Sequence, residues 1–250
     1  MKAIELVSLF KSFQSGSESV SVLKDFDLSI EAKEFVSIIG SNGSGKSTLL
    51  NLLSGKIKPD QGKILIQGKE VQTLPEHKRA VWIARVFQDP MQGTAPDLSI
   101  LENFRLAITR TTSKGLGIHT GKAFQELVKA KIAQLGLGLE TKINQEMGKL
   151  SGGQRQALTL LMASMTDAEV LLMDEPTAAL DPKTAALIMD LAQQFHEQKG
   201  WTTIMVTHNL KDAKEIGNRL LMMKSGKIHK DLKGIEKYKL ELTEIVNWFD

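Results

Sequence analysis

The stretch Gly40-Ser41-Asn42-Gly43-Ser44-Gly45-Lys46-Ser47 decides the fold of this 250-residue chain. It matches the pattern G-x-x-x-x-G-K-[ST] residue for residue, with an apolar run at 35–39 before it and helical spacing after it. Three glycines let successive backbone N–H groups point into one concavity, and the following helix presents its positive N-terminus there. We therefore predict a phosphate-binding loop between a strand and a helix, rather than a turn with an exposed lysine.

The last residues of this motif and the next one suggest how a nucleotide is held. We expect Lys46 to bind the β- and γ-phosphates and the Ser47 hydroxyl to ligate Mg²⁺, while Thr48 bonds an α-phosphate oxygen. Taken alone, the loop does not separate a transporter ATPase from a kinase or a GTPase.

A second motif lies downstream, where the apolar run 170–173 ends in Asp174 and Glu175. The carboxyl end of a strand is where open α/β sheets place their ligand chemistry. We expect Asp174 to reach Mg²⁺ through a bound water and Glu175 to polarise the attacking water. An acidic strand end can also be purely solvated, but the phosphate loop upstream favours the catalytic interpretation.

Hydrophobic patterning indicates one nucleotide-binding core interrupted by a helical insert. Apolar runs at 4–9, 20–30, 35–39, 63–66, 81–87, 169–173, 202–206 and 219–223 predict strands. Helical spacing dominates from about 89 to 165, with a Thr-, Gly- and Ser-rich connection at 111–121. We also expect a hairpin at Ser225-Gly226 and an amphipathic terminal helix over 235–249.

Composition excludes several classes of function. The chain is 42% hydrophobic and 24% charged, as in soluble globular proteins, and it has no cysteine for disulfides or thiolate metal sites. Its net charge is only +3, and its Lys and Arg residues are scattered among acidic residues rather than gathered into a basic stripe. No nucleic-acid partner is therefore expected. The first residues lack the uninterrupted apolar region of a signal peptide, so we do not expect secretion, and the longest uncharged apolar stretch falls short of the roughly 20 residues that span a bilayer. Four histidines show no metal-ligand spacing and are expected at the surface: His77, His119, His196 and His229.

The pentapeptide Leu150-Ser151-Gly152-Gly153-Gln154 is the most specific motif of the chain. It precedes a strong helical run, so we expect it to cap a helix whose free N–H groups attract a phosphate. In this position, after a phosphate loop and before an Asp-Glu pair, it resembles the signature of the ATP-binding cassette (ABC) ATPases. That resemblance implies a P-loop NTPase, RecA-like α/β core with an antiparallel β subdomain and an α-helical insert. It also implies ATP and Mg²⁺ as ligands.

The resemblance further implies a head-to-tail dimer with a second copy, in which Ser151, Gly152, Gly153 and Gln154 close on the nucleotide held by the partner's phosphate loop. Gln88 resembles the Gln loop that contacts Mg²⁺ and the attacking water, and His208 the switch histidine at the γ-phosphate. Residues 178–181, Ala-Ala-Leu-Asp, resemble the D-loop that crosses the dimer interface, with Ala where many relatives have Ser, which leaves Asp181 available there. Phe13, with Phe10 behind it, is the expected adenine platform, although either ring can simply be core.

These features predict a single ABC ATPase domain over 1–250. Its nucleotide-binding core would comprise 1–88 and 166–230, its helical subdomain 89–165, and its C-terminal helix 231–250. Stretches such as 84–90, 135–140 and 154–163 resemble one bacterial subfamily, from which the chain departs at Pro176. Those ATPases serve importers built with a separate permease and a solute-binding lipoprotein, some handling tryptophan or tyrosine.

We accordingly expect an energy-coupling subunit on the cytoplasmic side of the inner or plasma membrane. It would dock a membrane-embedded permease through 89–103 and reach the extracytoplasmic solute-binding protein only indirectly. The alternative is the ATPase of a soluble machine such as iron–sulfur cluster assembly.

Overall fold

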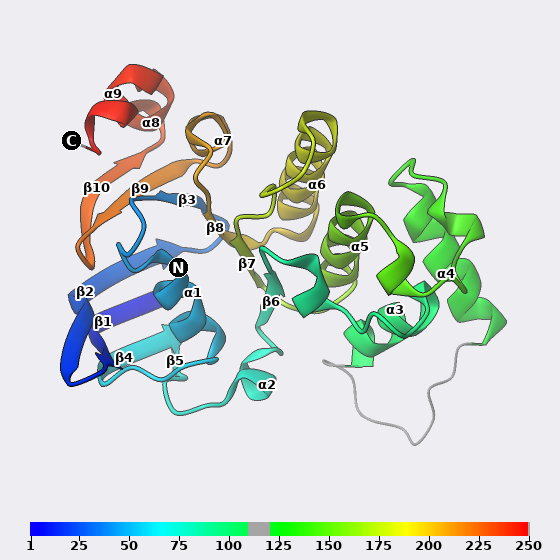
Figure 1. Cartoon of the computed structure of the whole chain (residues 1–250), viewed down its shortest axis with the longest axis horizontal. Helices are drawn as coiled ribbons and strands as arrows, with labels where there is room; N and C mark the ends of the chain where they lie inside the picture. Colours follow the sequence, from blue (N-terminus) through cyan, green and yellow to red (C-terminus); the bar gives the residue numbers. More distant parts are fainter. Residues whose placement is uncertain (110–120, 250) are drawn as a thin grey trace.

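The computed structural model describes residues 1–109 and 121–249, so the predicted connection at 111–120 and His119 lie outside the described residues. Figure 1 shows the layout: a predominantly parallel sheet runs from the upper left to the middle, an antiparallel sheet lies below its left half, and a group of helices lies on its right. The predicted α/β class, with an antiparallel sheet and a helical insert, is confirmed.

The central sheet has the strand order β10-β9-β3-β8-β7-β6. Neighbouring strands from β9 to β6 run parallel, and only β10 is antiparallel. Strands β3 and β8 are buried at every position, which explains why their sequences are largely apolar and carry no charge. The strand bounds are β3 Phe35–Ile39, β6 Ile83–Val86, β7 Val170–Asp174, β8 Thr202–Val206, β9 Arg219–Lys224 and β10 Lys227–Lys233.

The second sheet has the order β2-β1-β4-β5 and is antiparallel throughout. Helix α1 (Lys46–Ser54) lies between the two sheets, because its four leucines share one buried cluster with apolar residues of both. The helix that follows the phosphate loop therefore packs against both sheets. The strands are β1 Lys2–Ser15, β2 Glu18–Glu31, β4 Gln61–Ile66 and β5 Lys69–Glu70.

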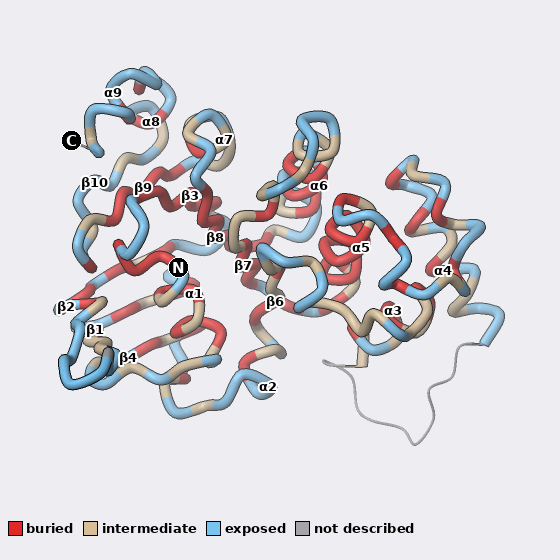
Figure 2. Tube along the Cα trace, in the orientation of Figure 1, coloured by how far each residue is buried: buried red, intermediate tan, exposed pale blue. Residues whose placement is uncertain are grey.

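Helices cover the other face of the central sheet. Helix α5 (Gly152–Ser164) is buried along most of its length, as the red tube in Figure 2 shows, and it packs against α6 (Pro182–Lys199). Helices α3 (Ile100–Thr109) and α4 (Lys122–Ala133) share its hydrophobic cluster. The shorter helical elements are α2 Glu76–Arg79, η1 Pro90–Gly93, η2 Leu139–Thr141, η3 Met147–Lys149, α7 Leu210–Glu215, α8 Ile235–Lys239 and α9 Leu242–Asn247.

All eight predicted strands and the hairpin at 225–226 are confirmed, although β1 is longer than predicted and β6 shorter. The single terminal helix over 235–249 is wrong. Leu240 is extended and buried in a cluster beneath α7, and Glu241 starts a new helix by forming a capping box with Glu244. Local periodicity could not show that Leu240 is needed in the core.

His77 and His229 are exposed as predicted. The prediction fails for His196, whose ring centroid lies 5.1 Å from that of Phe35 and whose Nδ1 lies 2.9 Å from Thr203 Oγ1. Burial lowers the pKa of His196, whose half-buried ring lies between α6 and strands β3 and β8 rather than at the surface.

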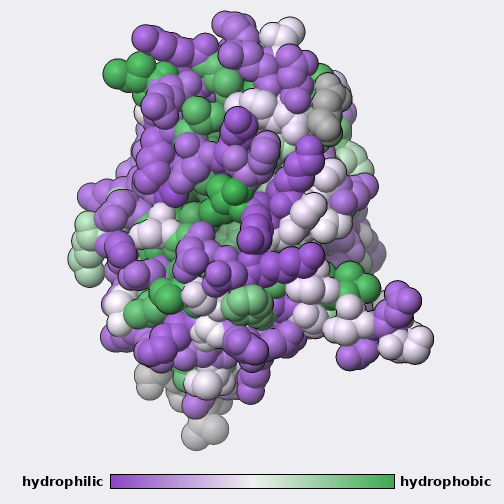
Figure 3. Space-filling model, turned by 90° about the vertical axis from the view of Figure 1, so that its left-hand side faces the viewer, coloured by the Kyte–Doolittle hydropathy of each residue, from purple (hydrophilic) through white to green (hydrophobic). Residues whose placement is uncertain are grey.

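Within the described residues, no helix is both long and apolar enough to cross a membrane. Figure 3 shows the face formed by the antiparallel sheet and the C-terminal helices, where apolar patches are separated by hydrophilic side chains. Exposed apolar residues on these elements include Val7, Val20, Ile235 and Tyr238.

Candidate functional site

The phosphate loop is pressed against strand β9. A Cβ on Gly40 would lie 2.3 Å from the Met223 carbonyl oxygen, so this close backbone approach admits only glycine. Gly45 has a φ of 103° and lies directly before α1. The β9–β10 hairpin also reaches the loop, because the Gly226 N–H donates to the Ser44 carbonyl at 3.2 Å. No sequence pattern indicates this support, because it comes from a segment far along the chain.

Lys46 is buried and its ammonium group lies over the loop. Its Nζ donates to the carbonyl oxygens of Gly40 at 2.7 Å and Ser41 at 3.0 Å. Burial lowers the pKa of Lys46, and the nearby carboxylates Glu175 and Asp174 oppose that shift. The two motifs predicted separately from the sequence therefore share one electrostatic site.

Glu175 and His208 form a pair at the ends of β7 and β8. His208 Nε2 lies 2.8 Å from Glu175 Oε1, and the Glu175 N–H donates to the Val206 carbonyl at 2.9 Å. Glu175 has a φ of 47°, which is strained for a residue with a side chain. The contact with His208 holds the Glu175 side chain, and the hydrogen bond to Val206 holds its backbone. A carboxylate held in this way is suited to orienting a water molecule.

A cavity of about 270 Å³ joins these parts. Phe13 lines one side of it, half-exposed, with Lys11 Nζ 5.4 Å from its ring centroid. The aromatic ring, the phosphate loop and the Glu175–His208 pair are thus brought together, as a nucleotide would require. The lining residues are Phe13, Val22, Asn42, Gly43, Gly45, Lys46, Ser47, Thr48, Glu175 and His208.

A second cavity, of about 460 Å³, lies beside the first and brings Gln88 and Asp174 together with Gly152. Gln156, deep in α5, connects its walls: Nε2 donates to the carbonyl oxygens of Phe87 and Pro176, both at 3.1 Å. Gln156 therefore ties the residue before Gln88 to the residue after Glu175. From the sequence, Gln156 is predicted only to lie in a strongly helical segment, with no indication of these two contacts.

The donor atoms near these cavities suit a hard cation. Ser47, Asp174 and Gln88 all offer oxygen, which Mg²⁺ prefers. Within 1–109 and 121–249, no group of three or more His, Cys, Asp or Glu residues forms a complete metal cage. A partial oxygen set fits Mg²⁺, because this ion keeps several waters and is shared with substrate phosphates.

The signature segment caps α5. Ser151 Oγ accepts from the Gln154 N–H, and Gln154 Oε1 accepts from the Ser151 N–H, which completes a capping box. None of the residues lining the cavity around Lys46 belongs to 150–154. Gly153 faces Thr184 of its own chain, since a Cβ there would lie 2.2 Å from Thr184 Cγ2.

Asp181 has an intrachain role that the sequence did not indicate. Its carboxylate caps α6 by accepting from the Lys183 and Thr184 N–H groups and from Thr184 Oγ1. These hydrogen bonds lower the pKa of Asp181. The carboxylate is therefore engaged rather than available, while Ala179 before it adopts a φ of 60°.

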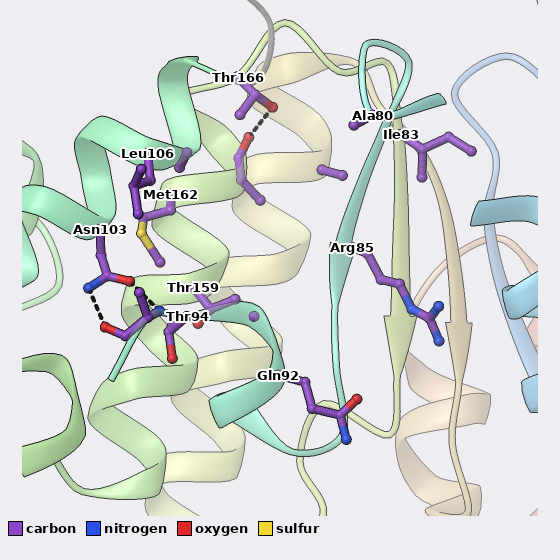
Figure 4. A pocket seen from close by; sticks show the side chains of 15 residues that line it. Ala80, Ile83, Arg85, Gln92, Thr94, Asn103, Leu106, Thr159, Met162 and Thr166 are labelled. Carbon is purple, nitrogen blue, oxygen red and sulfur yellow. Dashed lines mark hydrogen bonds between the residues drawn. The ribbon is translucent and has the colours of Figure 1, made fainter. Parts of the chain in front are cut away.

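A third cavity, of about 200 Å³, lies where β6 meets the helices (Figure 4). Asn103 fixes the loop at its rim, because its side chain exchanges two hydrogen bonds with the backbone of Ala95. The labelled side chains of Leu106, Thr159 and Met162 lie on the helical side of this cavity (Figure 4).

Comparison with known proteins accounts for this combination of features. The family model described as "ABC transporter" matches residues 23–178, which run from β2 past the Asp174–Glu175 pair. The chain belongs to this family. It is accordingly an ATP-binding cassette and an ATPase.

Relatives of the cassette extend over nearly its whole length. A tyrosine transport ATP-binding protein of Clostridioides difficile (strain R20291) is 40% identical over 251 residues, covering 99% of this chain and 98% of the relative. The lipoprotein-releasing system ATP-binding protein LolD of Idiomarina loihiensis is 34% identical over 227 residues, covering 89% and 95%. The ATP-binding cassette MJ0796, solved as a dimer in a post-hydrolysis state with ADP and phosphate, superposes with a TM-score of 0.80 at 31% identity, covering 92% of this chain and 98% of that one.

Proposed function

We propose that this cassette is the ATP-hydrolysing, energy-coupling subunit of a bacterial importer for an amino acid of the tryptophan or tyrosine type. The observation that carries the proposal is the 40% identity to a tyrosine transport ATP-binding protein along 98% of that relative's length. Similarity to LolD and to the macrolide exporter MacB of Campylobacter fetus supports transport in general rather than import. The substrate class therefore rests on the first relative.

In this proposal the whole chain acts as one cassette. Residues 1–88 and 166–230 form its nucleotide-binding core, 89–165 its helical subdomain and 231–250 its C-terminal extension. Phe13 stacks on adenine, residues 40–48 cradle the phosphates, and Lys46 neutralises the β- and γ-phosphates. The cavity lined by Phe13 and by most of the residues of this loop supports the assignment.

Hydrolysis would depend on the pair at the strand ends. Glu175 orients and polarises the attacking water, and His208 holds Glu175 while facing the γ-phosphate. The 2.8 Å contact between their side chains supports this division of roles. Ser47, Asp174 and Gln88 would hold Mg²⁺, which would supply charge stabilisation at the transferring phosphoryl group.

A second copy would complete each site. The signature residues Ser151, Gly152, Gly153 and Gln154 are proposed to close on the partner's nucleotide, since they lie outside the cavity around Lys46 in their own chain. The dimeric state of the MJ0796 cassette supports this arrangement. Closure and reopening of such a dimer would then drive the permease.

The permease would dock on 89–103, between β6 and α3, at the third cavity. Exposed Met91 and Leu106 and the fixed loop around Asn103 give this region an apolar, rigid surface. The cassette would thus lie on the cytoplasmic side of the membrane, held by its permease, and would act on the solute-binding protein only through it.

Purification of the chain with the products of its neighbouring genes tests the proposal against the soluble-machine alternative. Co-purification with a multi-span membrane protein is expected, and the complex in proteoliposomes should hydrolyse ATP faster when a binding protein loaded with tryptophan or tyrosine is added. A soluble scaffold as the sole stable partner would contradict the importer. Stimulation by an unrelated solute would contradict only the substrate class.

A further inference from the structure

Arg85, at the third position of β6, places a guanidinium group between several parts of the nucleotide site. It pairs in register with Leu172 of β7, two residues before Asp174. Its Nη2 lies 3.3 Å from Asp174 Oδ2, and its Nη1 donates to Ser54 Oγ at 3.1 Å. Its Cζ lies 4.6 Å from the centroid of the Phe87 ring. The arginine side chain is only 8% exposed, and that of Asp174 only 14%.

These contacts connect the parts of the chain that must be correctly placed relative to one another in the proposed mechanism. Ser54 is the last residue of α1, the helix that begins at Lys46. Phe87 directly precedes Gln88, and Asp174, Gln88 and Arg85 all line the 460 Å³ cavity. In Figure 4 the Arg85 side chain points away from Thr159 and Met162 of α5. The Arg85 side chain therefore lies on the side of β6 that faces the nucleotide site and does not pack against α5.

We propose that Arg85 is a positioning residue that holds one oxygen of the Asp174 carboxylate and leaves the other directed toward Mg²⁺. This inference rests on the proposed metal role of Asp174. A carboxylate this buried needs a partner, and Lys46 is a second cation near enough to interact with it. With Arg85 in place, Asp174 is held from β6, and Lys46 stays available to the phosphates.

The geometry makes the expected change specific to the metal. Loss of Arg85 frees Asp174 to turn toward Lys46, so the carboxylate no longer points at the cation. Partners of a metal-ligating carboxylate typically affect metal affinity by tenfold or more when they are removed. Stacking of adenine and contacts of the loop backbone with phosphate do not involve Arg85, so affinity for nucleotide without metal should stay within about twofold.

The test measures bound metal rather than hydrolysis. Purified protein is saturated with ADP and titrated with Mn²⁺, and free Mn²⁺ is followed by electron paramagnetic resonance. Arg85→Met, which keeps the apolar stem of the side chain but removes the guanidinium group, should raise the Mn²⁺ concentration at half-saturation by about tenfold. Arg85→Lys keeps one ionic contact and should give a smaller rise, which provides a readout should Arg85→Met fold poorly.

Arg79 offers a matched control. It is a fully buried arginine that binds the same end of α1, through the carbonyl oxygens of Leu52 and Leu53, but it does not contact Asp174. Arg79→Met should lower stability and leave the Mn²⁺ titration unchanged. An equal shift in Arg79→Met, an unchanged titration in Arg85→Met, or tighter Mn²⁺ binding there would overturn the inference.

Asp174→Asn in the same titration separates this inference from the proposed function. If Mn²⁺ binding is weakened in Asp174→Asn but unchanged in Arg85→Met, only the positioning role of Arg85 is refuted. No change in Asp174→Asn would remove the metal role on which both depend.

Discussion

Replacing Gln156 by leucine tests the link between the Gln loop and the catalytic carboxylate. The side chain is 1% exposed and donates to two backbone carbonyl groups, those of Phe87 and Pro176. Leucine has a similar volume but no donor, so both carbonyl oxygens lose their partner in a buried place. The change therefore removes the link without leaving a large cavity.

The expected magnitude follows from counting polar groups. Each carbonyl left unpaired costs about 1–3 kcal/mol. Against this, Gln156 Oε1 is buried and has no hydrogen-bond partner among the described residues, so leucine removes one existing penalty of similar size. The net loss in free energy of unfolding should be about 1–3 kcal/mol, measured by urea denaturation.

The effect on activity should exceed the effect on nucleotide binding. Gln88 directly follows Phe87, and Glu175 directly precedes Pro176, so both residues are next to a carbonyl group that Gln156 holds. Misplacement of catalytic side chains lowers the rate of the chemical step. We expect kcat to fall about tenfold while ATP affinity stays near that of the wild type. Gln193→Leu, the same change at an exposed site on α6, is the control for both measurements. A Gln156→Leu variant as stable and as active as the control would refute this role.

Three further predictions follow from the site and from the C-terminal extension. Glu175→Gln should still bind ATP but lose hydrolysis and accumulate as a dimer in size-exclusion chromatography; near-normal turnover would contradict its role as the base. Lys46→Ala and Ser151→Arg should each be inactive alone, but mixing them should restore about a quarter of wild-type activity through heterodimers with one intact site; no recovery with proven heterodimers would disprove shared sites. Burial lowers the pKa of Lys237 from 10.5 to about 8, so the unfolded chain binds that proton more tightly between these pH values. The stability of wild type relative to Lys237→Met should therefore rise by up to about 3 kcal/mol from pH 8 to pH 10.5 in urea titrations, and a flat difference would refute it.

Features that depend on neighbouring residues could be predicted from the sequence. Strand β3, the phosphate loop and the start of α1 form one continuous stretch, and alternation or continuity of apolar residues located seven further strands but not the two-residue strand β5. The capping box of Ser151 and Gln154 is equally local, because its two residues lie three apart. In each case the sequence pattern and the structure are set by the same short-range geometry.

The remaining features depend on residues far apart in the chain. Arg85 and Asp174 are 89 positions apart, and Gln156 is 69 positions from Phe87. Neither spacing carries a pattern, since the pairing of β6 with β7 and the docking of α5 create these contacts. A charged residue inside an apolar strand and a glutamine inside an apolar helix were the available signals, because such residues require buried partners.

Helix α5 carries both the local capping box of Ser151 and the long-range contacts of Gln156. The helix thereby connects the signature to the catalytic carboxylate within one chain. Gln154 and Gln156 are two positions apart, so they point to nearly opposite sides of the helix. Gln154 stays at the exposed cap with Ser151, whereas Gln156 reaches inward to Phe87 and Pro176. Because hydrogen bonds make a short helix stiff, a contact that shifts Ser151 also shifts Gln156. A partner's nucleotide bound at the cap would therefore act on Gln88 and Glu175 of the chain that offers the cap, and Gln156→Leu should weaken that coupling even in a dimer that still forms.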